Sequence, residues 1–282
     1  MKNIKHFVVH ELLMKTKNKI LFAKILSKLI TIFISKKQIV IRNKIKWNLD
    51  LDEGIDLSVF LFGTSEKKVL NIIKLLSKKE KNITIIDIGA NIGSVSLLLA
   101  QIFQNSKVYA IEPTNYAFEK LSNNLRLNKD LVNKVFLRQL FLANKNKPQK
   151  VWSSWNFDKS HEKHQKHLGT LKEIKPNIYI RLDEFIKNEG LKNVDFIKLD
   201  VDGYELDVLR SGEEFLKKNK PVIFIEIAPY LYPEFGYNCY DLIKFLEKLN
   251  YKFLEENLKE VSNIHDRVKE IKDGSSTNFF LI

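Results

Sequence analysis

The sequence is poor in cysteine, glycine and proline, and each shortage excludes a kind of protein. Among 282 residues there is one cysteine, Cys239, so neither an internal disulfide nor a cysteine-based zinc site can form, which fits a reducing compartment. Ten glycines and six prolines leave no low-complexity linker. Because 44% of the residues are hydrophobic, the chain can build a substantial core, as one large α/β domain with an appendage or as two small domains.

Acidic residues are almost absent before Trp47. Glu11 alone opposes twelve lysines and arginines there, so this segment holds +11 of the formal net charge of +13. The rest of the chain is close to neutral, which argues against a charged groove across the whole fold. We therefore expect a basic amphipathic segment, residues 1–46, followed by one domain, residues 47–282.

No hydrophobic run reaches the roughly 20 residues that a membrane span needs. The best candidate, Ile20–Ile34, is interrupted by Lys24 and Lys28, and no small-residue cleavage site follows it. Two interpretations stay open: a helix packed on the domain with solvated lysines, or a helix lying in an anionic membrane interface. We expect a cytoplasmic protein, which in the second case is peripheral at the inner membrane face. Nucleic acid is not an expected partner, because no aromatic residues are interleaved with the basic ones.

The stretch Ile83–Gly93 has the pattern of a buried strand, a tight turn and the start of a helix. Isoleucines at 83, 85, 86 and 88 predict a strand buried on both faces, as in a parallel sheet. Gly89 and Gly93 then turn the chain, and an apolar helix follows from Ser94. A strand, a glycine turn and a helix N-terminus together can hold a nucleotide-like ligand, whereas the alternative is an ordinary tight turn.

The spacing of these glycines favours one class of ligand. A dinucleotide site needs G-x-G-x-x-G, but Gly89 and Gly93 are only four positions apart, with Asn91 between them. Asp87 precedes the turn, and the whole pattern resembles the first motif of S-adenosylmethionine (AdoMet) methyltransferases. The next predicted strand, residues 107–111, ends at Glu112, whose carboxylate can accept hydrogen bonds from both ribose hydroxyls of an adenosine.

Three further carboxylates follow a second buried strand. Lys198 lies within the predicted strand Val194–Leu199, and Asp200, Asp202 and Glu205 come directly after it. Ligands in open α/β sheets bind beyond the carboxyl ends of strands, so these side chains should lie near the Gly89 turn. Glu226 occupies a similar position near the end of the predicted strand 221–227. Glu205 has a simpler alternative, a favourable charge in the first turn of the next helix.

A run of histidines, His161, His164 and His167, lies in a polar connection. Residues three apart share a helical face, so a metal site can be imagined there. Lysines at 163 and 166 and the lack of a fixed acidic ligand favour a solvated basic face instead.

The motifs together resemble the FkbM family of AdoMet-dependent methyltransferases. The matching pieces, in order, are IIDIGANIG at 85–93, AIEP at 110–113, RLDEF at 181–185, VDFIKLDVDGYELDVL at 194–209 and PVIFIE at 221–226. The resemblance implies an α/β fold: a doubly wound, mostly parallel seven-stranded Rossmann-like methyltransferase sheet, here with a basic helical N-terminal extension. It also implies AdoMet as cofactor, and the cofactor-binding residues that we expect are Asp87, Gly89, Ala90, Asn91, Gly93, Glu112, Pro113 and Asp200.

The family usually methylates hydroxyls of sugars or other natural products. A hydroxyl acceptor needs a base, or a metal that lowers its pKa. We expect Asp200 nearest the methyl group, Asp202 on the acceptor or a hard cation, and Lys198 as their counter-charge. If Mg²⁺ is used, Asp200, Asp202 and Glu226 are its candidate ligands.

The sequence therefore predicts an O-methyltransferase acting on a small-molecule, glycan or lipid-linked hydroxyl. An RNA methyltransferase is a weaker alternative, because the domain is nearly neutral and no N-P-P-Y-type tetrapeptide follows the fourth strand. A non-catalytic, membrane-associated adaptor with a vestigial cofactor fold is an alternative from another class.

Overall fold

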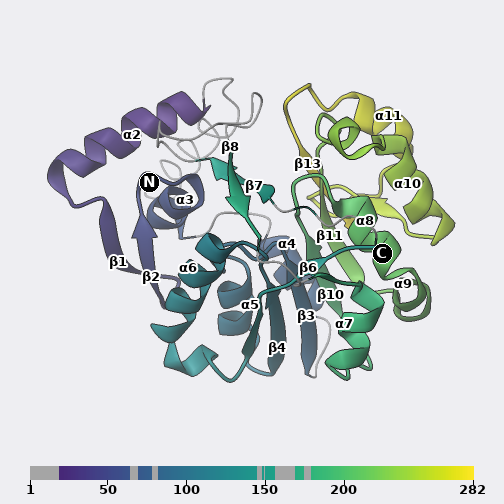
Figure 1. Ribbon diagram of the computed structural model, residues 1–282, viewed down its shortest axis with the longest axis horizontal. Helices are drawn as coiled ribbons and strands as arrows, with labels where there is room; N and C mark the ends of the chain where they lie inside the picture. The colour runs from purple at the N-terminus through teal and green to yellow at the C-terminus, as the bar shows by residue number, and fades with distance from the viewer. Residues whose placement is uncertain are drawn as a thin grey trace.

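The computed structural model describes residues 19–63, 69–77, 82–144, 148, 150–155, 169–174 and 179–282. Its centre is a seven-stranded sheet, as the sequence predicts, with the strand order β12-β13-β11-β10-β3-β4-β5 (Figure 1). The strands are β3 (Ile83–Ile88), β4 (Ser106–Ile111), β5 (Val135–Arg138), β10 (Phe196–Leu199), β11 (Val222–Ile227), β12 (Phe253–Leu254) and β13 (Thr277–Leu281).

All neighbouring strands in this sheet are parallel except where β13 is involved. β13 lies between β11 and β12 and is antiparallel to both. The chain order reverses at the centre, because β3 pairs with β4 on one side and with β10 on the other. Such a switch point opens a crevice at the carboxyl ends of the strands, which is where ligands bind in open α/β sheets.

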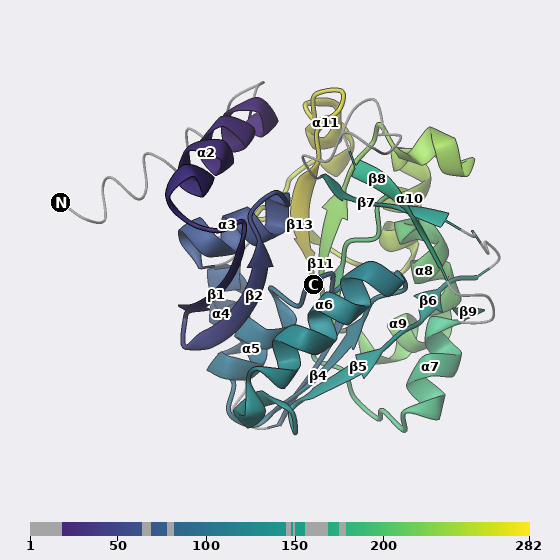
Figure 2. The same ribbon diagram turned by 60° about the vertical axis from the view of Figure 1, so that its left-hand side comes forward.

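Helices cover both faces of the sheet, which makes the fold doubly wound (Figures 1 and 2). The protein has two hydrophobic cores, and β3 contributes side chains to both. Ile86 and Ile88 pack in the first core, and Ile83 and Ile85 pack in the second. The first core packs under α7 (Leu182–Asn188), α8 (Glu205–Ser211), α9 (Glu213–Asn219), α10 (Cys239–Lys248) and α11 (Ile264–Lys269). The second packs under α4 (Val69–Leu76), α5 (Ser96–Ile102) and α6 (Asn115–Arg126).

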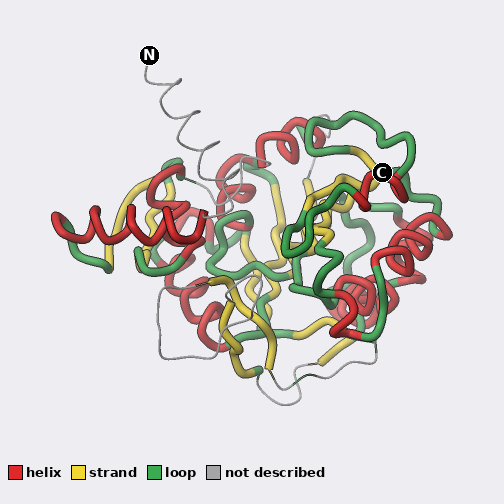
Figure 3. Tube along the Cα trace, turned by 90° about the horizontal axis from the view of Figure 1, so that it is seen from above, coloured by secondary structure: helices red, strands yellow, loops and turns green. Residues whose placement is uncertain are grey.

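The N-terminal elements form a layer on the second face. Helix α2 (Lys19–Phe33) leads into a hairpin of β1 (Lys37–Arg42) and β2 (Ile45–Asp50), followed by helix α3 (Gly54–Phe62). Figure 3 shows α2 and this hairpin at one end of the molecule. Trp47 and Leu49 of β2 are buried in the second core, so the hairpin crosses the expected boundary between residues 46 and 47.

Two expectations about secondary structure are wrong. The sequence of residues 46–62 predicts a short hairpin or an extended cover over one edge of the sheet, but residues 54–62 form α3, which ends at Gly63 in the left-handed conformation. The largely apolar run of residues 134–142 predicts one strand, but it divides into β5 and β6 (Phe141–Leu142). β6 lies outside the main sheet and pairs with β9 (Tyr179–Ile180). A further hairpin, β7 (Lys150–Trp155) with β8 (Gly169–Glu173), continues to a bridge between Ile174 and Thr114.

No helix among the described residues combines the length and the apolar character that crossing a bilayer requires. His161, His164 and His167 lie outside the described residues.

Candidate functional site

The turn after β3, which we call the glycine turn (residues 89–93), is shaped by contacts within the protein. Gly89, Asn91 and Gly93 all have positive φ, at 82°, 49° and 89°. A Cβ atom on Gly89 would lie 1.8 Å from the backbone oxygen of Asp200, and one on Gly93 would lie 2.5 Å from a methyl of Leu121. Glycine is therefore required at both positions before any ligand is considered, which the sequence pattern alone did not reveal.

Neighbouring segments hold the glycine turn in place. The N–H groups of Gly89 and Ala90 both donate to the oxygen of Ile111 at the end of β4, each at 3.0 Å. The buried Asn124 of α6 donates to the oxygen of Ile92 at 3.0 Å and accepts from the N–H of Asn48 at 2.9 Å. This side chain therefore links the turn to the β1–β2 hairpin.

Glu112 joins the ends of β3 and β4. One carboxylate oxygen accepts from the N–H of Asn91 at 3.0 Å. The other accepts from the N–H of Thr114 at 3.0 Å and from its hydroxyl at 2.6 Å. Burial raises the pKa of Glu112, although these hydrogen bonds oppose the shift. A carboxylate has about four acceptor sites, so these three bonds leave about one for a ribose hydroxyl. Pro113 lies next to this carboxylate, ahead of α6.

Lys198 forms the centre of a buried charge group. It lies opposite Asp87 in the parallel pairing of β10 with β3, and its ammonium is 3.7 Å from Asp87 Oδ1. The same ammonium is 3.1 Å from Asp200 Oδ2 and donates to the oxygen of Gly89 at 3.4 Å. One lysine thus connects the ends of both strands, and its role as a counter-charge in the reaction stays a prediction.

Asp87 is fully buried within this group. Its Oδ2 accepts from the hydroxyl of Ser96 at 2.5 Å, whereas Oδ1 has no hydrogen-bond partner among the described residues. Burial raises the pKa of Asp87, and the nearby charge of Lys198 opposes that shift. Ser96 begins α5, so Asp87 also fixes the helix that follows the glycine turn.

The turn after β10, which we call the acidic turn (residues 200–205), is held by its own glutamate. Glu205 is buried and accepts from the N–H of Val201 at 3.1 Å and from that of Gly203 at 3.1 Å. Burial raises the pKa of Glu205 to about 7. A Cβ atom on Gly203 would lie 2.1 Å from the ring of Phe235. Glu205 therefore stabilises the turn and does more than add a charge to a helix end.

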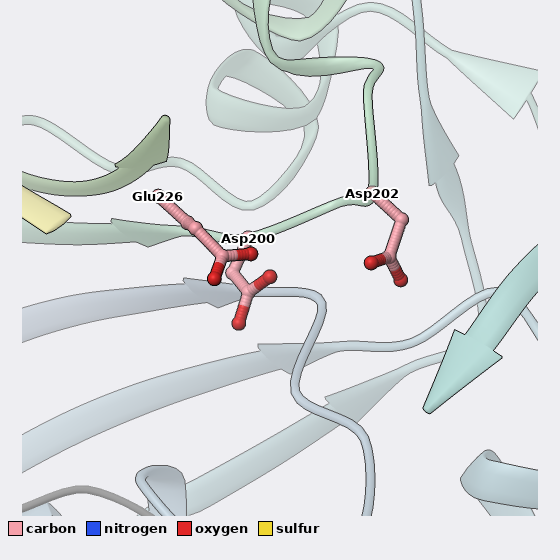
Figure 4. A group of neighbouring side chains, drawn as sticks. All are labelled: Asp200, Asp202 and Glu226. Atoms are coloured by element: carbon pink, nitrogen blue, oxygen red, sulfur yellow. The ribbon is translucent and has the colours of Figure 1, made fainter. Parts of the chain in front are cut away.

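Three carboxylates converge above the ends of β10 and β11. Oxygen atoms of Asp200, Asp202 and Glu226 lie within 4.8 Å of one another (Figure 4). Burial, followed by the negative charges of Asp200, Glu205 and Glu112, raises the pKa of Asp202 well above its ordinary value. Asp202 has a φ of 48°, so a left-handed backbone places its side chain. Glu226 accepts from the hydroxyl of Ser276 at 2.5 Å.

A second buried charge network was not anticipated from the sequence. Asp56 of α3 is fully buried and accepts from the N–H of Asp50 at 2.6 Å and from the ammonium of Lys120 at 2.5 Å. Lys120 also contacts Glu53 at 3.0 Å. Burial raises the pKa of Asp56 to about 6. An aspartate within the apolar stretch 54–62 was the available signal, and the network anchors α3 to α6.

Known proteins resemble this chain in sequence. Residues 87–253, more than half of the chain, match the Methyltransferase FkbM domain. The 2-O-methyltransferase NoeI of Sinorhizobium fredii is 27% identical over 171 residues, which cover 56% of this chain and 68% of NoeI. The methyltransferase sdnD of Sordaria araneosa is 27% identical over 158 residues, which cover 46% of this chain and 60% of sdnD.

Solved structures resemble the chain more remotely. An FkbM methyltransferase from Methylobacillus flagellatus has 16% identity and a TM-score of 0.42, over 71% of this chain and 44% of that one. M. jannaschii TYW2 in complex with AdoMet has 16% identity and a TM-score of 0.41, over 87% of this chain and 84% of that one. The domain match, with the motifs found in order on the central sheet, supports AdoMet-dependent methyl transfer: the chain belongs to the FkbM family of methyltransferases.

Proposed function

We propose that the protein transfers the methyl group of AdoMet to a hydroxyl of a sugar, glycan or lipid-linked acceptor. The observation that carries this proposal is the position of Asp200 and Asp202, with Lys198, beside the glycine turn. NoeI, a relative at 27% identity, is a 2-O-methyltransferase, which supports oxygen as the atom that is methylated.

The charges at this edge of the sheet suit the cofactor. AdoMet supplies a methyl group on a positively charged sulfonium and also carries an ammonium group. Asp87, Asp200 and Asp202 provide negative charge beside the glycine turn, where we place the amino-acid part of the cofactor. We assign the ribose to Glu112 and the surrounding contacts to Gly89, Ala90, Asn91, Gly93 and Pro113.

Asp202 is our candidate for the base. Methyl transfer is an in-line displacement in which the carbon–sulfur bond breaks as the carbon–oxygen bond forms, so positioning contributes much of the catalysis. The hydroxyl proton passes to the Asp202 carboxylate, whose raised pKa makes it a stronger base than an ordinary aspartate. Lys198 holds Asp200 in place at 3.1 Å and limits the build-up of negative charge.

The same carboxylates fit Mg²⁺ poorly. A cation bound by Asp200, Asp202 and Glu226 would share Asp200 with the ammonium of Lys198, only 3.1 Å from its Oδ2. Two positive charges on one carboxylate repel each other. We therefore base no step on Mg²⁺, and its use stays a prediction from the sequence.

Isotope transfer tests the proposal. The full chain is incubated with methyl-labelled AdoMet and a cell-derived glycan and lipid extract. Label should enter base-stable ether products, because an O-methyl ether resists the alkali that cleaves a methyl ester. Asp202→Asn should lower transfer at least about 100-fold, since it removes the base. Glu119→Gln, an exposed change on α6, is the matched control and should leave transfer unchanged.

Two results would contradict the proposal: label found mainly in RNA or in base-labile esters, or full transfer by Asp202→Asn. AdoMet binding, measured separately by calorimetry, shows whether a loss of transfer reflects chemistry or cofactor affinity. A glycine-turn substitution such as Gly89→Arg is unsuitable as a control, because its side chain would collide with the backbone of Asp200.

A further inference from the structure

Helix α2 presents an apolar stripe to solvent. Ile25, Leu29, Ile32 and Phe33 follow the spacing of one helical face, and all four are exposed. Ile32 keeps 70% of its surface accessible and Phe33 keeps 85%. A helix that packs on a domain normally turns such a stripe inward.

The face of α2 that is turned toward the protein is less apolar than this stripe. Ser27 is fully buried there, and its hydroxyl donates to the backbone oxygen of Leu51 at 2.8 Å. Ile30 adds a partly buried contact with the second core. The helix is therefore anchored by a hydrogen bond, and among the described residues its exposed apolar stripe is left uncovered, which marks a candidate interaction surface.

The adjoining strand β1 adds to this surface. Ile39 and Ile41 are 66% and 61% exposed, whereas Val40 between them is partly buried against the second core. Figure 2 shows α2 and the hairpin on the same flank of the molecule. We call the set Ile25, Leu29, Ile32, Phe33, Ile39 and Ile41 the apolar flank.

The segment that carries the apolar flank has charges of one sign in its own sequence. Residues 19–46 contain eight lysines and arginines and no acidic residue. Lys28, Lys37 and Lys44 are exposed, and Lys36 pairs with Asp52 at 2.5 Å. Exposed apolar side chains surrounded by lysines complement a lipid bilayer with anionic headgroups, because lysine stems can extend to the phosphates while the apolar groups enter the acyl boundary.

We propose that the apolar flank is a docking surface for an anionic membrane, with α2 lying in the plane of the interface. The sequence left two interpretations of the segment Ile20–Ile34 open, a helix packed on the domain or a helix in a membrane interface, and the proposal favours the second. It is independent of the reaction that the enzyme catalyses. In Figure 1, α2 lies at the same upper side of the molecule as β7 and β8, whose hairpin reaches Thr114 just beyond the end of β4. Docking would thus bring the cofactor side of the sheet toward the bilayer.

Vesicle co-sedimentation of the full chain tests this surface. The protein is mixed with vesicles of phosphatidylcholine alone or of phosphatidylcholine with phosphatidylglycerol. Phe33→Asp should weaken binding to the anionic vesicles at least about tenfold, because an aromatic side chain no longer enters the bilayer. Lys28→Glu should weaken it about fivefold or more and leave binding to neutral vesicles less affected.

Val132→Asp is the matched control, because it adds the same charge at another exposed apolar residue, between β5 and the preceding 3-10 helix. It should bind like the unaltered protein, and both Asp variants should keep the thermal stability of the parent. Three results would overturn the proposal: no affinity for anionic vesicles, equal binding by Phe33→Asp and Val132→Asp, or self-association that Phe33→Asp abolishes without any vesicle binding. The last would show that a second copy covers this flank.

Discussion

The glycine turn and the acidic turn occupy equivalent positions at the ends of adjacent parallel strands, yet they are built differently. Each has left-handed residues, and in each a buried glutamate accepts backbone N–H groups. The glycine turn is held by Glu112, which belongs to the next strand connection. The acidic turn is held by Glu205, which lies five residues beyond its own start.

The two glutamates therefore stabilise different amounts of structure. Glu112 connects two strand ends, so a ligand that binds there depends on the spacing between β3 and β4. Glu205 stabilises a single turn. Asp200 and Asp202 can therefore act on a ligand while the hydrogen bonds of Glu205 keep the backbone of that turn in place. We therefore expect changes in the glycine turn to affect folding and cofactor affinity most strongly, and changes of Asp200 or Asp202 in the acidic turn to affect chemistry.

The largest effect should come from Gly89→Ala. Its Cβ would lie 1.8 Å from a backbone oxygen of β10's end, which cannot move without breaking the sheet. We expect a loss of more than about 4 kcal/mol in the free energy of unfolding, or failure to fold. For Gly203→Ala the atoms nearest the added Cβ belong to the ring of Phe235, a side chain and not backbone, so a smaller loss of about 2–3 kcal/mol is expected.

Urea unfolding measures both losses. Gly190→Ala serves as the control, because Gly190 also has positive φ but has nothing within 4 Å of the added Cβ, so only about 1–2 kcal/mol of backbone strain is expected. Equal losses for Gly89→Ala and Gly203→Ala would remove the distinction between the two turns.

A smaller effect is expected on cofactor affinity. In Glu112→Gln, the new amide group must face a backbone donor of Asn91 or Thr114, so a buried hydrogen bond is lost along with the charge. Calorimetry should show AdoMet binding weakened about tenfold or more. Glu205→Gln should change this affinity less than about threefold. The assignment of the ribose to Glu112 would be wrong if the two variants bound AdoMet equally well.

The smallest effect concerns pH. Burial raises the pKa of Glu205 from an ordinary 4.5 to about 7, so the folded protein holds this proton more tightly than the unfolded chain. The free energy of unfolding should therefore decrease as pH rises from about 4.5 to about 7. Glu205→Gln should make that dependence shallower, which unfolding measured at several pH values can show. An unchanged slope would mean that Glu205 is charged in the native state throughout.

Most strands of the central sheet could be predicted from local patterns in the sequence. Short β-branched runs such as 83–88 and 222–227 predict buried strands because few other structures can bury both faces of so short a segment. Helix α3 was missed because the alternating pattern of residues 49–52 continues past the end of β2 at Asp50, and α3 begins only four positions after that end, at Gly54. Strand β6 was merged with β5 because the apolar pattern continues although the pairing partner changes.

The sequence could predict which site residues lie close together, but it could not predict the contacts that hold them there. Parallel strands bring their carboxyl ends to one edge, so the grouping of Asp87, Lys198 and Asp200 follows from the strand assignments. The requirement for glycine at 89 depends on a backbone oxygen more than a hundred residues away. The pairing of Asp56 with Lys120 joins residues 64 positions apart, and no local pattern signals it.

Strand β13, residues 277–281, has a consequence for biosynthesis. It occupies an interior place in the sheet, between β11 and β12, although it follows both of them in the chain. Until it emerges, β11 presents an open edge with unpaired backbone groups, which is the surface that chaperones and aggregating chains recognise. The sheet can therefore close on this side only once residues 277–281 have been synthesised and have paired with both neighbours.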